Sequence, residues 1–84
     1  MEWHLSRIYN LNMKDELLFK IGQNVRYIRL KNSLSQEELA FRAGLNMNSI
    51  STLERGVNNV KIKTLYNIAC ALNITLIDLL DCRI

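Results

Sequence analysis

Apolar residues recur along most of this chain at intervals of three and four, which is the spacing of one face of an α-helix. The pattern is clearest over 15–32, where the apolar positions are Leu18, Ile21, Val25 and Ile28. Asp15 is a candidate N-cap for this segment. Gly22 lies inside it and costs about 1 kcal/mol relative to alanine in a helix. We therefore expect another helix to approach Gly22 closely.

Two shorter helical patterns follow, each with its own start and stop signal. Ser35 and Glu38 form the S-x-x-E capping box of the first, and Gly44 is placed to end it in a left-handed conformation. Asn46 is a good N-cap for the second, which Gly56 ends. Two helices of about eight residues, joined by a turn of about four, predict a helix-turn-helix.

The C-terminal third of the chain carries two further helical patterns. We expect a fourth helix over 61–73, with the inward residues Leu65, Ile68, Ala69 and Leu72. Thr75 is a candidate N-cap of a short last helix. The sequence contains no proline and no strand pattern. It therefore predicts a compact all-α domain with five helices, or six if the N-terminal extension forms one of its own.

Residues 1–14 are set apart as that extension, and 15–84 form the predicted domain. A loose helical stripe runs through the extension and consists of Trp3, Leu5, Ile8 and Leu11. Asn10 and Asn12 weaken it. Two alternatives stay open for this segment, a short extra helix that packs Trp3 on the body or a flexible tail.

Size and charge limit the function without fixing it. A chain of 84 residues is one domain at most, and so small a domain gains stability from a partner subunit. The net charge of +3 has the sign that suits nucleic acid. Between residues 20 and 63 eight Lys and Arg residues stand against three Glu, so the segment with the helix pair is more basic than the whole.

The candidate chemistry for catalysis or metal binding is sparse. Cys70, Cys82 and His4 do not have the spacing of a metal site, and we expect free thiols in a reducing cytosol. The acidic residues are scattered, and no glycine-rich phosphate loop is present, so the sequence predicts neither an enzyme nor a cofactor. No apolar run approaches the roughly 20 residues that span a bilayer. No signal peptide is recognisable, and we expect a cytoplasmic protein without a membrane partner.

The outward positions of the second helix of the pair carry no charge. They are Met47, Asn48, Ser49, Ser51 and Thr52. A solvated helix face more often carries Glu, Lys and Arg, whereas amides and hydroxyls form hydrogen bonds with base edges. An ordinary polar helix remains the alternative. The last helix is apolar almost all round, at Leu76, Ile77, Leu79 and Leu80. We expect that surplus to form a subunit interface, because one short helix cannot bury all four residues against its own domain.

The run from residue 21 to residue 80 resembles the lambda-repressor-like, or Cro/C1-type, helix-turn-helix family. The resemblance lies in IGQNVRYIRLKNSLSQEELAFRAG, SISTLERG and LYNIACALNITLIDLL. It implies a sequence-specific DNA-binding transcriptional regulator that binds a palindromic operator on double-stranded DNA as a homodimer. RNA polymerase would be a further partner if the protein activates transcription.

A narrower resemblance concerns the loop before the fourth helix. Many family members have a proline where this chain has Val60, and RGVNNVKIKTL resembles the controller proteins of restriction–modification systems. Those proteins regulate their own gene and time the expression of the endonuclease. A prophage or plasmid repressor, or an antitoxin-type repressor that also binds a protein, stays open as an alternative.

The resemblance also assigns roles by position. The recognition helix corresponds to 47–55, so its five outward residues would read bases. The residues that would contact phosphate are Ser35, Gln36, Arg55, Asn58, Asn59 and Lys61. Arg29 and Glu54 would form a structural ion pair between the first and third helices. The absence of Arg and Lys from the base-reading positions argues against a strong guanine contact there.

Overall fold

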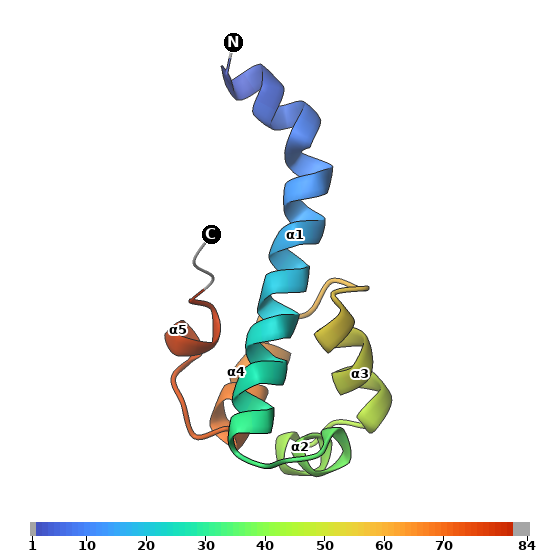
Figure 1. Ribbon diagram of the computed structural model, residues 1–84, viewed down its shortest axis with the longest axis vertical. Coiled ribbons are helices and arrows are strands. Elements are labelled where there is room, and N and C mark those ends of the chain that lie inside the picture. The colour runs from blue at the N-terminus through green and yellow to red at the C-terminus, as the bar shows by residue number, and fades with distance from the viewer. Residues whose placement is uncertain (1, 82–84) are drawn as a thin grey trace.

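The computed structural model describes residues 2–81, with side chains from residue 16 onward, and this part of the chain forms five helices without a strand (Figure 1). The helices are α1 (Glu2–Lys31), α2 (Gln36–Ala43), α3 (Met47–Arg55), α4 (Ile62–Ala71) and α5 (Leu76–Leu79). The predicted all-α class with five helices is confirmed. None of the helices in the described range is both long and apolar enough to cross a lipid bilayer.

The first helix is longer than the sequence pattern predicts. It begins at Glu2 and runs without a break for 30 residues, so Asp15 lies in its interior and is not its N-cap. The chain has neither glycine nor proline before Gly22, and nothing in the backbone stops the helix earlier. The N-terminal residues are therefore neither a separate helix nor a tail, and Figure 1 shows them projecting beyond the body. The expected packing of Trp3 lies outside the side chains that the structure describes.

A single apolar core joins all five helices. Its buried members are Ile21, Val25, Leu34, Leu39, Ala40, Ala43, Ile50, Leu53, Leu65, Ile68, Ala69, Leu72 and Leu79. All four residues predicted to face inward from the fourth helix are among them. Each fully buried Leu or Ile contributes about 1.5–3 kcal/mol. This burial holds α2 and α3, which are too short to be stable alone.

The ends of α2 and α3 are set by the signals that the sequence predicts. The Ser35 hydroxyl accepts a hydrogen bond from the N–H of Glu38 at 2.9 Å, and the Glu38 carboxylate accepts one from the N–H of Ser35 at 2.8 Å. The Asn46 side chain caps α3 through a hydrogen bond of 2.8 Å. Gly44 and Gly56 follow the two helices at φ of 71° and 67°, which is left-handed backbone. The predicted helix-turn-helix is confirmed.

The backbones of α1 and the C-terminal end of α3 lie in direct contact. A Cβ at Gly22 would collide with the carbonyl oxygen of Leu53 and lie 2.7 Å from that of Glu54. A Cβ at Gly56 would lie 2.7 Å from the Cα of Phe19 on α1. The expected close approach at Gly22 is therefore present, and a second glycine makes the same kind of contact one helical turn away along α1.

Candidate nucleic-acid interface

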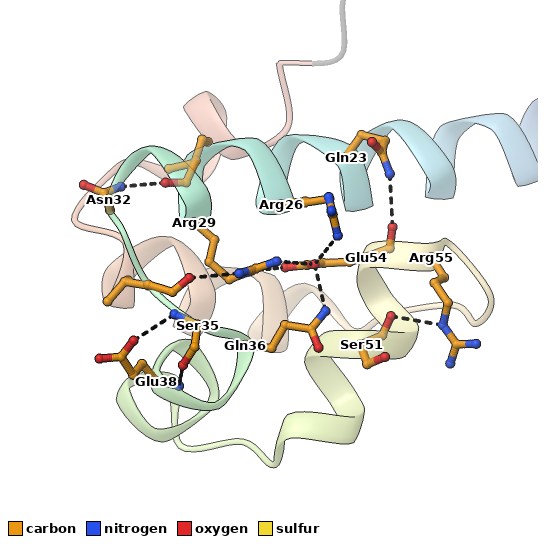
Figure 2. Close-up of polar contacts among 12 residues, drawn as sticks. Gln23, Arg26, Arg29, Asn32, Ser35, Gln36, Glu38, Ser51, Glu54 and Arg55 are labelled. Carbon is orange, nitrogen blue, oxygen red and sulfur yellow. Dashed lines mark hydrogen bonds and ion pairs between the residues drawn. The ribbon is translucent and has the colours of Figure 1, made fainter.

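A buried ion pair joins α1 to α3. Arg29 donates from Nε to Oε2 of Glu54 at 2.6 Å and from Nη2 to Oε1 at 3.0 Å. The two residues are only 5% and 3% exposed. Arg29 also donates from Nη1 to the carbonyl of Leu34 at 2.8 Å, so its guanidinium holds the α1–α2 turn as well. The pair expected between Arg29 and Glu54 is present, in a two-bond geometry (Figure 2).

The position of Glu54 explains why α3 needs that partner. Glu54 lies in the last turn of α3, where the negative end of the helix dipole disfavours a carboxylate. It is also buried, and a buried carboxylate without a partner is strongly destabilising. Arg29 compensates both effects. The pair therefore fixes the C-terminal end of α3 against α1.

A third side chain reaches the same carboxylate from α2. The Gln36 amide donates from Nε2 to Oε1 of Glu54 at 3.0 Å (Figure 2). An amide nitrogen carries two N–H groups, so one remains for another acceptor. The first residue of α2 is thereby fixed beside α3. In the predicted phosphate contact, Gln36 would use the second N–H while it keeps Glu54.

The polar side chains on the outer face of α3 fall into two groups, those that already form hydrogen bonds within the chain and those that do not. The Thr52 hydroxyl donates to the carbonyls of Asn48 and Ser49 at 3.0 and 3.2 Å, and the Ser49 hydroxyl bonds the Asn46 side chain at 3.0 Å. These two hydroxyls can still accept hydrogen bonds. Within the described residues, the side chains of Asn48 and Ser51 form no hydrogen bond. Asn48 is exposed at the N-terminal end of α3, so its amide can donate and accept together.

Two open hollows flank α3, one on each side. The first has a volume of about 290 Å³ and includes the polar residues Ser49, Thr52, Asn58, Asn59, Lys61 and Thr64. The second has a volume of about 350 Å³ and lies between α1 and α3, with the lining residues Phe19, Gln23, Arg26, Gln36, Ser51, Glu54 and Arg55. The predicted phosphate contacts divide between the two. Asn58, Asn59 and Lys61 are in the first hollow, and Gln36 and Arg55 are in the second. Ser35, the sixth predicted contact, lines neither hollow, and its hydroxyl caps α2.

Two polar residues of the second hollow, Gln23 and Arg26, were not predicted as part of the site. Both come from α1, for which only the Arg29–Glu54 pair was expected to reach the third helix. Their spacing carried a signal, because Arg26 lies three residues before Arg29 and Gln23 lies three before Arg26. Residues at that spacing share one side of a helix. Gln23 donates to the carbonyl of Glu54 at 3.5 Å.

The apolar surface that α5 leaves for a second subunit is smaller than expected. Leu79 is fully buried in the core of its own chain, and Leu76 and Leu80 are half-buried against that core. Ile77 is 80% exposed. One short helix therefore covers more of its apolar residues than we expected. Leu79 is unavailable to a second copy of the chain, and the surplus is Ile77 with the uncovered parts of Leu76 and Leu80.

The residue types that bind metal ions are dispersed in the described part of the chain. No group of three or more His, Cys, Asp or Glu side chains comes together there. Cys70 is an exposed free thiol on α4. Cys82 and His4 lie outside the described side chains.

Comparison with known proteins points to one family. A helix-turn-helix family model matches residues 25–79. The chain is 43% identical over 70 residues to the control protein C.BamHI of Bacillus amyloliquefaciens, and the aligned region covers 82% of this chain and 86% of that protein. It is 43% identical over 60 residues to the control protein C.SmaI of Serratia marcescens, and the aligned region covers 71% of each protein. The crystal structure of the restriction–modification controller protein C.AhdI from Aeromonas hydrophila superimposes with a TM-score of 0.75 at 38% identity, over 77% of this chain and 94% of that one.

Proposed function

Since this chain belongs to the helix-turn-helix family of Cro/C1-type regulators, we propose that it is a sequence-specific DNA-binding regulator of transcription that controls a restriction–modification system. The family consists of DNA-binding regulators and is not an enzyme family. One observation carries the proposal for this chain. The five outward residues of α3 are uncharged, and all but Met47 are polar. Hollows lined with hydrogen-bond donors lie on both sides of them.

That arrangement suits the major groove of B-form DNA. The groove is about 12 Å wide and admits one helix, and its two walls are the sugar–phosphate strands. With α3 in the groove, each hollow would face one strand. Asn48 would form hydrogen bonds with a base edge, adenine being the base that suits an amide, and Met47 would contact a thymine methyl group. Ser49, Ser51 and Thr52 would add hydroxyl contacts.

We propose further that two copies act together on a palindromic operator. Two recognition helices about 34 Å apart enter successive major grooves on one face of the duplex. Ile77, with the uncovered parts of Leu76 and Leu80, supplies the apolar surface for the contact between copies. The names of the relatives favour a controller of restriction–modification over a prophage repressor or an antitoxin.

Selection from a pool of randomised duplexes tests the proposal. The purified protein should enrich a two-fold symmetric sequence whose half-sites are about one helical turn apart, and the same sequence should be protected in the promoter of its own gene. Lys61→Ala is the matched control, because loss of a phosphate contact should weaken binding and leave the enriched sequence unchanged. An unenriched pool at moderate ionic strength would contradict the proposal.

A further inference from the structure

Arg29 alone balances the negative charge of the Glu54 carboxylate. Arg29 donates to both of its oxygens, and Gln36 donates to Oε1. Nη1 of Arg26 lies 4.0 Å from Oε1, which is beyond hydrogen-bond distance. The Arg26 side chain is 53% exposed, against 6% for Arg29. Arg26 is therefore a second cation beside a carboxylate that one arginine already pairs.

The charge of the second hollow follows from this arrangement. Arg26, Arg29 and Arg55 carry three positive charges at or beside it, and Glu54 carries one negative charge, so an excess of two positive charges remains. The guanidinium of Arg26 forms no hydrogen bond within the described residues. Gln36 lies beside it with an unused N–H, and Arg55 lies at the edge, held by a hydrogen bond of 3.4 Å from Nε to the carbonyl of Ser51 (Figure 2).

Such a set of groups fits a tetrahedral oxyanion. The planar fork of an arginine matches two oxygens of a phosphate group, and its charge makes those hydrogen bonds stronger than neutral ones. The amide of Gln36 adds a neutral donor from a second direction. Because the hollow flanks α3, an oxyanion held there would lie beside the helix that faces the bases.

We propose that the second hollow binds a phosphate group of the DNA backbone and that Arg26 is its principal ligand. The inference rests on the proposed function, and it adds the first helix to the DNA-binding surface. Arg26 turns from Glu54 onto the phosphate, while Glu54 keeps Arg29 and Gln36. The scaffold pair is then unchanged by DNA binding, and Arg26 gives up only a weak, half-exposed ion pair.

Salt dependence of DNA binding separates this role from a structural one. Arg26→Gln should reduce the slope of log Kobs against log salt by about one, on the selected operator and on unrelated duplexes alike. Between about 50 and 200 mM salt, the affinity of this variant should therefore fall by a factor three to four times smaller than that of the parent. Lys20→Gln is the matched control, because Lys20 is on the same helix, pairs with Glu16 at 3.9 Å and lies outside the hollow. Its slope should equal that of the parent.

Two further measurements decide between the possible outcomes. Arg26→Lys keeps the charge and should keep the slope while binding more weakly than the parent, because an ammonium lacks the fork. A parental slope in Arg26→Gln, with a lowered melting temperature, would overturn the inference and make Arg26 a structural partner of Glu54. That result leaves the proposed function standing as long as the parent binds its selected operator. Absence of operator binding by the parent would instead remove the proposed function itself.

Discussion

The two faces of α3 belong to the same nine residues, yet they follow different chemistry. On the inner face Ile50 and Leu53 are buried in the core, and Glu54 is held by Arg29 and Gln36. On the outer face Asn48 and Ser51 have side chains that nothing else in the described chain binds. The inner face has almost no freedom left, whereas the outer face keeps its hydrogen-bonding capacity for another molecule.

This difference shows where stability and recognition are located in so small a protein. A short helix cannot contribute to both through the same side chains, because a group that is buried and paired is unavailable to a ligand. Substitutions on the inner face should therefore change the free energy of unfolding. Substitutions on the outer face should change binding and leave unfolding unaffected.

The largest effect is expected for Glu54→Gln. This change leaves the buried guanidinium of Arg29 without its counter-charge, which costs about 3–5 kcal/mol. In a domain of this size the melting temperature should fall by roughly 12 °C or more. The double variant Arg29→Met with Glu54→Leu is the control and should be less destabilised in thermal unfolding. A single variant that melts within a few degrees of the parent would show that the inner face does not depend on this pair.

A smaller loss is expected for Gly22→Ala. The new methyl group would meet the carbonyl oxygens of Leu53 and Glu54, which are backbone atoms and cannot turn aside. The cost should be about 2–3 kcal/mol in urea unfolding, even though alanine is the better helix former. Gly44→Ala is a useful comparison, because a Cβ there meets no atom within 4 Å, and only its left-handed φ is strained. Equal losses for both variants would refute the close approach as the cause.

The outer face should behave in the opposite way. Asn48→Ala should leave the melting temperature unchanged and relax sequence preference at one base-pair position of each half-site, by about 1–3 kcal/mol of discrimination. Lys61→Ala should weaken binding to every sequence by the same factor, so that sequence preference is unchanged. Competition binding with a panel of operator variants checks both. Uniform loss of affinity in Asn48→Ala would contradict the assignment of base reading to this face.

The smallest effect concerns an exposed carboxylate, in contrast to the buried Glu54. Hydrogen bonds from the backbone N–H of Ser35, and then from its side chain, hold the pKa of Glu38 below its usual range. A lowered pKa in the folded state means that the stabilisation is complete above the usual pKa of a free glutamate and is lost as the pH falls through the lowered value. The difference in urea midpoint between the parent and Glu38→Gln should therefore be present at neutral pH and vanish in acid. A difference independent of pH would exclude the carboxylate charge as its source.

Local signals allowed much of this fold to be predicted. The capping box at Ser35, the glycines at 44 and 56 and the inward spacing of the fourth helix depend on neighbours in sequence, and the structure has each of them. The Arg29–Glu54 pair joins residues 25 apart, and only the family resemblance suggested it.

The errors have physical reasons too. Asp15 suits an N-cap, but a cap residue also fits inside a helix that nothing interrupts. Leu79 could not be separated from its neighbours, because a single turn of helix has no periodicity to read. Gln23 and Arg26 reach the α3 face only because α1 and α3 touch at Gly22, a contact between segments distant in sequence.

The two glycine contacts between α1 and α3 have one more consequence. Since main chain rests on main chain at Gly22 and Gly56, the tilt of α3 does not depend on the identity of its outward side chains. Those side chains can therefore be substituted without a change in the position of the helix. During evolution, a protein with this backbone could gain a new target sequence through a few substitutions on α3, while its orientation on the duplex stays the same.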